Sequence, residues 1–471
     1  MIQNLLIFTP YIALAIGILH LGFLYIFKED RAKFYSRTAR FWLIISLFFG
    51  IIFYAVSPFE AYFKNNAYSL LFILIIYMLI YHILGLSVAW FSSKNRTGCL
   101  FDMLLLAATL ALSLLIEATN LLALFLCYTM IVMINYGLLR INDNKTQVSL
   151  AFGITGNIIF CLFIVAIGYF YHELGGNLGY AELKTFLLKN PTSFLCFGAV
   201  TALILPFFYA LGIAPLHIAT EDKLSLSALP VSHFFAIVLP LAFLGAFIKL
   251  NLVLYTVYPD VLGQVYLVFA LISVIFGAIG ANARINLQRI YAYSSLYHLG
   301  LVLLLLSLGH NHTDFAAFIY LFAYLLSLNG AYLVFYSLKS HGEYLSSIAG
   351  IAGLAETRAY ATGALSVSLF SLIGIPPLIG FWGMFNFAYE IVQAKYFISL
   401  GIALAFLLVM FKAYLEIIKT AYFEHKVRIF DTVNRWVLLY MALNVLMITL
   451  LVFNPCHIFE RIKDMFYVVF L

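Results

Sequence analysis

Charged residues are scarce in this chain of 471 amino acids, where Asp, Glu, Lys and Arg together make up only 10%. Soluble globular domains carry about 25% charged residues, so this composition excludes that class of protein. Cysteine is also rare, and the five cysteines show neither a CxxC pair nor the spacing of metal ligands. No glycine-rich phosphate loop, flavin motif or iron–sulfur motif occurs either. We therefore expect no metal, no redox cofactor and no redox chemistry within this chain.

Apolar residues take the place of the missing charge. They make up 65% of the chain, and the mean hydropathy is +1.04. Apolar runs of about 20 residues, the length that crosses a bilayer, recur from end to end. The sequence thus predicts an all-α polytopic membrane protein whose first partner is the lipid bilayer. The expected spans lie near residues 4–27, 41–56, 69–92, 101–116, 120–139, 148–171, 193–217, 230–256, 264–281, 290–308, 313–338, 360–392, 396–422 and 436–454.

The few basic residues indicate an orientation. Seventeen of them fall in the first loop and in every second loop after it, whereas the alternate loops and the C-terminal tail hold six. Loops rich in Lys and Arg remain on the cytoplasmic side of a membrane, or the matrix side in mitochondria. Both termini are therefore expected to face outward. The net charge of +6 follows from this loop bias and needs no nucleic acid.

Two of the expected spans carry helix-breaking residues in apolar surroundings. Proline removes a backbone donor and clashes with the preceding turn, so a continuous helix is disfavoured at these points. The two spans are the seventh and the twelfth, which run in opposite directions. Broken helices at matching places favour an inverted repeat of spans four to eight and nine to thirteen, as in transporters. The residues expected to break these helices are Pro206, Pro215, Gly374, Pro376, Pro377 and Gly380.

Four separated motifs carry a resemblance to a known family. They are APLHIATED with ALPVS (214–232), AYSSLYHLG (292–300), AYLLSLNGAYLVF (323–335) and SLIGIPPLIGFWGMF (371–385). In this order they resemble the antiporter-like subunits of respiratory complex I and of multisubunit sodium/proton antiporters. The tract around Leu328, Asn329 and Gly330 is most similar to subunit N of complex I. The resemblance covers roughly residues 100–425.

This resemblance implies a subunit-N-like component of the membrane arm of a complex I type NADH:quinone oxidoreductase. It implies fourteen helices, sister membrane subunits at the sides, no quinone bound by this chain alone, and a bacterial or mitochondrial inner membrane. A multisubunit cation/proton antiporter, a membrane-bound hydrogenase and a transport-inactive scaffold remain as alternatives. The expected division is an N-terminal segment (1–100), two repeats (101–256 and 264–425) and a C-terminal helix with an outer tail (426–471).

The sequence departs from the family at its central charges. The family places a Glu in the fifth span, Lys in the seventh and eighth spans, and Lys or Glu in the twelfth. The matching positions here are Thr129, Ala210, Pro240 and Met384. A buried lysine is a useful proton carrier because its pKa changes readily, but none of these four side chains can titrate. Proton translocation is therefore expected to be altered or lost.

Four other titratable residues remain as relay candidates. Lys412 and Glu416, four residues apart on one helix face, could form a displaced relay or a buried, self-neutralised ion pair. His298 matches a family histidine and could relay protons, or it could be a neutral, hydrogen-bonded core residue. Lys249 lies near the outer end of its span, where it could take part in transport or extend its amine to the interface.

Polar residues after the seventh span could admit protons. His217, Glu221 and Asp222 would lie at its inner end, where they form either a proton inlet or an ordinary solvated loop face. His233 stands alone in an apolar run, and we expect it to be structural. Residues 172–192 are expected to form an amphipathic helix at the outer interface.

Overall fold

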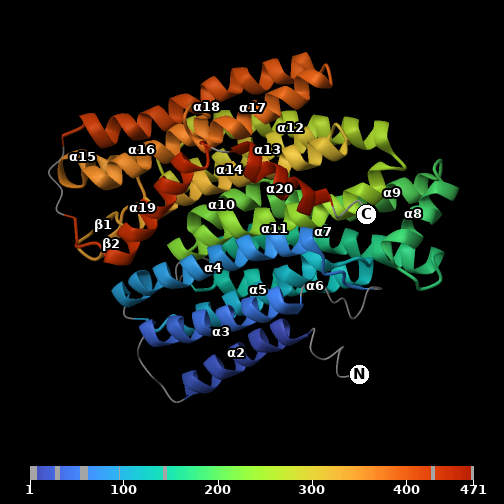
Figure 1. Cartoon of the computed structure of the whole chain (residues 1–471), viewed down its shortest axis with the longest axis horizontal. Helices are drawn as coiled ribbons and strands as arrows, with labels where there is room; N and C mark the ends of the chain where they lie inside the picture. Colours follow the sequence, from blue (N-terminus) through green and yellow to red (C-terminus); the bar gives the residue numbers. More distant parts are fainter. Residues whose placement is uncertain are drawn as a thin grey trace.

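The computed structural model describes residues 8–26, 32–53, 62–94, 96–141, 146–425, 430–453 and 455–467. Helices that run side by side form almost all of this described chain (Figure 1). The only strands in these ranges are β1 (Lys339–Ser340) and β2 (Glu343–Tyr344), which pair as a short antiparallel hairpin. The predicted all-α polytopic membrane fold is confirmed.

Twelve of the described helices are long and apolar enough to cross a membrane. They are α2 (Thr9–Ile26), α3 (Ala32–Phe53), α4 (Ala67–Ser93), α5 (Cys99–Glu117), α6 (Leu121–Leu139), α7 (Thr146–Glu173), α9 (Phe194–Leu211), α11 (Leu229–Tyr255), α12 (Pro259–Asn282), α13 (Leu287–Leu306), α14 (Asn311–Phe335) and α18 (Phe397–Phe423).

The remaining helices are shorter. They are α8 (Tyr180–Lys189), α10 (Ile218–Leu226), α15 (Leu354–Thr357), α16 (Ala359–Ile373), α17 (Ile379–Gln393), α19 (Arg435–Leu450) and α20 (Pro455–Tyr467), with a 3-10 turn at Ile348–Ile351. The expected twelfth span corresponds to α16 and α17 together, and the expected fourteenth corresponds to α19. The amphipathic segment predicted at 172–192 contains α8.

The two ends of the bundle differ in their connections. The β1–β2 hairpin and α15 lie at one end, which we call the hairpin end, and α8 lies at the opposite end, the α8 end (Figure 1). At the hairpin end Asp431 accepts hydrogen bonds from the backbone amides of His341 (3.0 Å) and Gly342 (2.8 Å). The Lys339 amine lies 3.8 Å from the same carboxylate. These contacts tie the hairpin to the segment that leads into α19.

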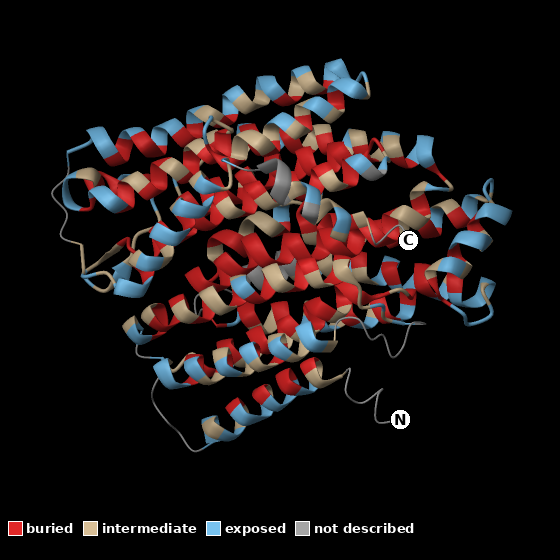
Figure 2. Ribbon diagram, viewed as in Figure 1, coloured by how far each residue is buried: buried red, intermediate tan, exposed pale blue. Residues whose placement is uncertain are grey.

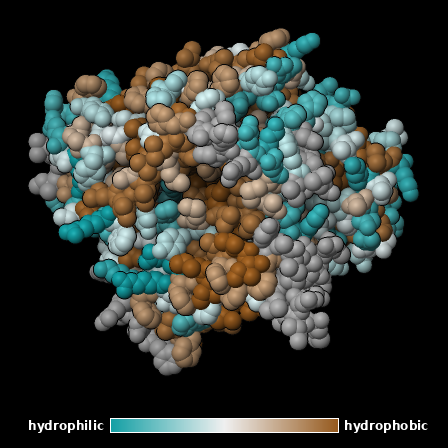
Figure 3. Space-filling model, viewed as in Figure 1, coloured by the Kyte–Doolittle hydropathy of each residue, from teal (hydrophilic) through white to brown (hydrophobic). Residues whose placement is uncertain are grey.

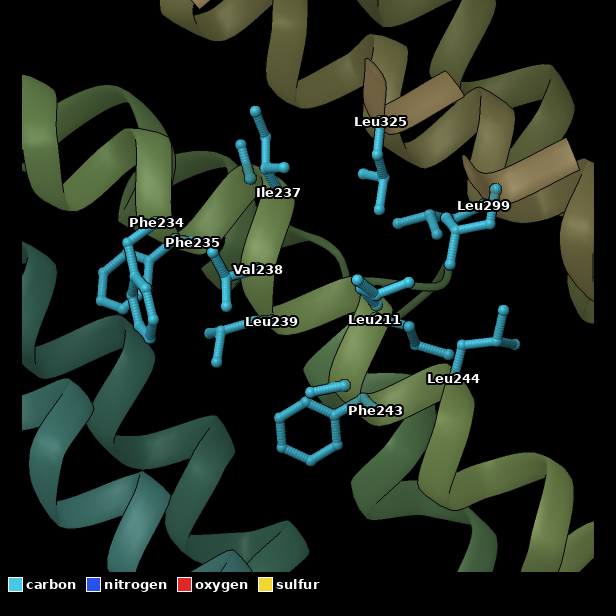
Figure 4. Packing of buried hydrophobic residues seen from close by; sticks show 14 of the residues in the cluster. Leu211, Phe234, Phe235, Ile237, Val238, Leu239, Phe243, Leu244, Leu299 and Leu325 are labelled. Carbon is cyan, nitrogen blue, oxygen red and sulfur yellow. The ribbon is translucent and has the colours of Figure 1, made fainter. Parts of the chain in front are cut away.

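Three helices form the centre of the molecule. Helices α11, α13 and α14 are buried along almost their whole length, as the red ribbon in Figure 2 shows. A helix that is apolar on all sides is suited to such a position. Figure 4 shows residues of α11, including Phe243 and Leu244, packed with Leu211 of α9, Leu299 of α13 and Leu325 of α14.

Peripheral helices show the opposite pattern. Helices α2, α3 and α18 each expose many large apolar side chains, among them Leu19, Phe48 and Leu408. Apolar residues cover broad areas of the face seen in Figure 3. In a membrane such faces contact lipid tails or neighbouring chains, so their exposure is a normal feature of this class of protein.

The twelfth span is interrupted in its middle. Helix α16 ends at Ile373 because Gly374 takes a left-handed conformation with a φ of 87°. Pro376 and Pro377 follow in the connecting loop, and α17 begins at Ile379. Gly380 lies in the first turn of α17, where a Cβ atom would collide with the carbonyl oxygen of Ser371. The two half-helices can therefore approach each other closely only with glycine at this position.

The seventh span ends differently from the prediction. Pro206 lies inside α9, which continues without interruption to Leu211, so the expectation that Pro206 breaks the helix is wrong. Helices inside membranes tolerate proline because neighbouring elements satisfy the freed carbonyl. The interruption comes later, at Gly212 (φ 72°) and in the loop containing Pro215, before α10 begins.

Candidate functional site

The four residues expected from the resemblance to replace the family's central charges, Thr129, Ala210, Pro240 and Met384, have neutral side chains. Thr129 on α6 donates its hydroxyl to the Leu126 carbonyl oxygen at 2.7 Å, within its own helix. Ala210 lies in the last turn of α9, and Pro240 is buried inside α11. Met384 packs half-buried in α17. A proton carrier would have to be another titratable group, because none of these four side chains ionises.

His298 provides such a group at the centre of the second half of the chain. Its side chain is buried on α13, and its Nδ1 atom is hydrogen-bonded to the Tyr320 hydroxyl at 2.7 Å. Its Nε2 atom is hydrogen-bonded to the Tyr414 hydroxyl at 3.2 Å, and that hydroxyl also bonds Ser294. The ring stacks on Tyr324 with centroids 4.5 Å apart. Because one nitrogen of a neutral imidazole donates and the other accepts, both of these bonds fit an uncharged ring.

Two further contacts extend this group toward the broken helix. Tyr324 donates its hydroxyl to Ser295 at 2.6 Å. One turn along α14, Ser327 donates to the Ser371 hydroxyl at 2.7 Å, and that oxygen accepts the Gly380 amide at 3.2 Å. Polar side chains of α13, α14, α16 and α18 thus meet beside the α16–α17 interruption. We call the residues around the histidine the central network: Ser294, Ser295, His298, Tyr320, Tyr324 and Tyr414.

The predicted inlet residues lie at the α9–α10 interruption. Glu221 on α10 pairs with Arg284 at 3.0 Å and accepts the Tyr293 hydroxyl at 2.5 Å. Arg289 lies 3.8 Å from the same carboxylate. His217 is half-buried beside Tyr293, with ring centroids 6.2 Å apart. These contacts join the loop before α10 to the start of α13.

A small cavity connects the inlet residues with the central network. Its volume is about 10 Å³, and His217, Glu221, Tyr293 and Ser295 are among the residues that line it. That volume is at the lower limit for one water molecule. Ser295, which accepts the Tyr324 hydroxyl, thus belongs both to the lining of this cavity and to the central network.

Burial and neighbouring charges shift the pKa values of three inlet side chains, Asp222, Arg284 and Lys223. Burial and the neighbouring Glu221 raise the pKa of Asp222 above its ordinary value. The hydrogen bond with Tyr293 and the charge of Glu221 raise the pKa of Arg284, which therefore stays charged. Burial lowers the pKa of Lys223 to about 8. Asp222 thus binds a proton more readily than an ordinary exposed aspartate.

Lys412 and Glu416 do not join the central network. Both side chains are exposed on the outward face of α18, and neither forms an ion pair within the described ranges. The expectation of a buried pair is wrong because α18 is peripheral and turns its other face, with Met410 and Tyr414, toward the bundle. The inward residue of this helix is therefore Tyr414, which sequence reasoning missed.

His233 has more partners than its apolar surroundings suggest. Its Nε2 atom is hydrogen-bonded to Asn329 at 2.9 Å, and its ring stacks on Tyr332 with centroids 5.1 Å apart. The neighbouring Ser232 is hydrogen-bonded to the Tyr332 hydroxyl at 3.0 Å. Both nitrogens have partners, because Nδ1 contacts the Tyr336 hydroxyl at 3.4 Å. This arrangement is that of a satisfied, buried histidine.

One sequence signal connects the two histidines. Tyr320, Tyr324 and Tyr332 lie on helix α14 and Tyr336 is its C-cap residue, so they form two pairs, each spaced by four residues and sharing a helix face. The first pair contacts His298 and the second pair contacts His233. Two tyrosine pairs with a spacing of four residues were the available clue to these contacts.

Lys249 lies in a different place from the central network. It is only 7% exposed, and its amine lies 5.7 Å from the centroid of the Tyr68 ring. The alternative in which this lysine extends to the interface is therefore wrong, because helices α4 and α5 pack around α11 at this point. Two buried carboxyl groups near the same end, Glu117 and Asp314, were not singled out in the sequence.

Comparison with known proteins gives a family match. The family model described as "NADH:quinone oxidoreductase/Mrp antiporter, TM" matches residues 118–411. NADH-quinone oxidoreductase subunit N of Rickettsia bellii is 27% identical over 332 residues, which cover 69% of this chain and 72% of that protein. Subunit N of Pelagibacter ubique is 26% identical over 475 residues, covering 98% of this chain and 99% of the relative.

Solved structures share the fold. A chain of respiratory complex I from Thermus thermophilus with bound aureothin has a TM-score of 0.79 at 21% identity, over 96% of this chain and 98% of that one. A chain of the archaeal membrane-bound sulfane sulfur reductase has a TM-score of 0.85 at 17% identity, over 99% and 97%. A chain of the Mrp complex from Dietzia sp. DQ12-45-1b has a TM-score of 0.82 at 14% identity, over 100% and 98%.

Proposed function

Because the chain belongs to the NADH:quinone oxidoreductase/Mrp antiporter transmembrane family, we propose that it is a subunit-N-like component of the membrane arm of a complex I type NADH:quinone oxidoreductase. The observation that carries this proposal is the alignment with subunit N of Pelagibacter ubique over nearly the whole of both chains. In this role the chain packs against sister membrane subunits. It carries no redox cofactor, binds no quinone on its own and has no contact with nucleic acid.

The chain is a multi-pass membrane protein, and we propose a bacterial or mitochondrial inner membrane as its location. The loop bias in basic residues supports an orientation with the hairpin end on the cytoplasmic or matrix side. The α8 end and both termini then face outward. Within this arrangement residues 1–100 form an N-terminal segment, 101–256 and 264–425 form the two repeats, and 426–471 form the C-terminal part.

The central network suggests how protons could move without central lysines. A proton accepted at one imidazole nitrogen of His298 can leave from the other, and hydroxyl groups can pass it on because each both donates and accepts. On the inlet side Glu221 and His217 line the small cavity beside Ser295, and together with the adjacent Asp222 they supply the protons. Translocation is therefore altered relative to a lysine-based relay. A transport-inactive scaffold is the competing possibility.

Affinity purification tests the assignment. We expect a tagged chain, extracted in a mild detergent, to co-purify with other complex I membrane subunits and with the NADH-oxidising arm, as read by mass spectrometry. Deletion of the chain should lower the NADH:quinone oxidoreductase activity of membranes. Co-purification with subunits of a cation/proton antiporter or a hydrogenase would instead support one of those alternatives and contradict the proposal.

A further inference from the structure

A second group of buried ionisable side chains lies near the α8 end, apart from the central network. Glu117 is the last residue of α5, Lys249 lies on α11 and Asp314 lies in the first turn of α14. Their exposed fractions are 3%, 7% and 3%. An ionisable group buried in a membrane protein is costly and usually serves transport. Helix α11, which carries Lys249, packs against both α5 and α14, so the three groups lie on neighbouring helices.

The contacts connect Lys249 with Glu117 directly and with Asp314 by way of Tyr68. The Lys249 amine lies 5.7 Å from the centroid of the Tyr68 ring, and the Tyr68 hydroxyl donates to the Gly245 carbonyl oxygen at 2.7 Å. Lys249 is within electrostatic range of Glu117, and Tyr68 is within range of Asp314. Tyr68 of α4 thus links the basic residue with the second acidic residue.

The polar atoms of the three residues are incompletely bonded. The Lys249 amine, one oxygen of Glu117 and one oxygen of Asp314 are buried and have no hydrogen-bond partner among the described residues. A structural ion pair in a membrane requires close, well-aligned hydrogen bonds to offset the loss of hydration. Such a pair is not formed by Lys249 within the described part of the chain. The arrangement resembles a site that exchanges protons more than one that holds the fold together.

A cavity leads from this group toward the α8 end. Its volume is about 590 Å³, and its lining includes the buried residues Asn251 and Asp314 together with Asp260 and His310. These residues come from α11, α12, α14 and the loop between α13 and α14. Glu117 lines a separate cavity of about 20 Å³, which has room for one water molecule. Asp314 is thus a buried, incompletely bonded carboxyl group with access to a space that can hold many waters.

We propose that Glu117, Lys249 and Asp314 form a proton-exchange site that opens to the outer side of the membrane through the cavity lined by Asp314. The step moves one proton and no electrons. Protonated Lys249 passes its proton by way of water to the Asp314 carboxylate and becomes a neutral amine, and Asp314 then releases the proton into the cavity. Glu117 stabilises the charged form of Lys249 by its proximity. The inference rests on the proposed function, because the site has a role only in a chain that carries protons.

Matched variants in the assembled complex test the exchange. In proteoliposomes we expect Lys249→Met and Asp314→Asn each to lower the number of protons moved per NADH oxidised, while uncoupled NADH oxidation keeps its wild-type rate. Glu173→Gln is the control, because this exposed carboxyl group at the end of α7 lines neither of the two cavities. Unchanged proton ratios in both test variants would overturn the proposal.

Accessibility gives a second measurement that requires no activity. We expect Asn251→Cys, deep in the cavity, to react with a membrane-impermeant thiol reagent added from outside to native membranes, above the background of the five native cysteines. Absence of labelling would mean that the cavity is closed to the outside and would overturn the proposal even if the Lys249 and Asp314 variants failed to assemble. If the chain instead purified without complex I subunits, the proposed function would fail while a positive labelling result still stood.

Discussion

Removal of the Tyr414 hydroxyl is the most informative single perturbation of the central network. This hydroxyl bonds both His298 Nε2, at 3.2 Å, and the Ser294 side chain. Replacing the residue by phenylalanine keeps the ring, which is buried on the inward face of α18. The change Tyr414→Phe therefore tests the hydrogen bonds alone.

The expected loss of stability comes from the polar atoms that lose the Tyr414 hydroxyl as their partner. A buried polar group that loses its partner costs about 1–3 kcal/mol. His298 Nε2 has no alternative partner among the described residues, so it should contribute the full amount. The Ser294 hydroxyl can turn to a carbonyl oxygen one turn earlier in α13 and should contribute little. We thus expect Tyr414→Phe to lower the free energy of unfolding by about 1–3 kcal/mol.

Unfolding in mixed detergent micelles would measure this change. Tyr422→Phe is the matched control, since Tyr422 lies two turns further along the same helix and is 41% exposed. Its effect should stay within about 0.5 kcal/mol. In a background carrying His298→Leu, Tyr414→Phe should cost less than it does alone, because the stranded nitrogen is then absent.

The same variant separates the two interpretations of His298. If the network relays protons, Tyr414→Phe should also lower the number of protons moved per NADH oxidised by the assembled complex. If His298 is only a structural core residue, stability should fall and the proton ratio should stay unchanged. Equal stability of the Tyr414→Phe and Tyr422→Phe variants would refute the hydrogen-bonded network itself.

Three further predictions concern the fold. Gly380→Ala should destabilise the α16–α17 interruption, because the added Cβ would collide with the Ser371 carbonyl oxygen. The control Gly401→Ala has open space around it and should be neutral or slightly stabilising in the same unfolding assay. A cysteine at His425 should react with an impermeant reagent only from the cytoplasmic or matrix side, and one at Lys189 only from the outside; the reverse pattern would contradict the proposed orientation. Backbone amides of Gly342 and His341 lower the pKa of Asp431, so its contribution to stability is present above the pKa of the unfolded chain. This contribution should be lost as the pH falls through the lowered pKa of Asp431 in the folded protein. Amide hydrogen exchange at residues 339–344 should then become faster, and Asp431→Asn should abolish this pH dependence.

The composition and the local chemistry of the sequence were sufficient to predict the class of fold. Long apolar runs can satisfy their backbone groups in a membrane only as helices, so the spans could be placed from hydropathy alone. The interruption at Gly374–Pro377 was also predictable, because a left-handed glycine and two prolines leave no helical alternative. The continuous helix through Pro206 was not predictable, because a single proline can be accommodated when neighbouring helices pack around it.

The site depended on which face of each helix turns inward, and that is a property of the tertiary packing. Lys412 and Glu416 share one face of α18, but only the packing of α18 against the bundle shows that this face is the outer one. Lys249 lies near a helix end, yet α4 and α5 enclose it. The sequence by itself determined a polytopic helical protein and the places of its apolar spans. Only the tertiary structure brought His298 to its tyrosines, and Lys249 into range of Glu117 and Tyr68, because contacts between distant helices depend on their relative rotation and depth.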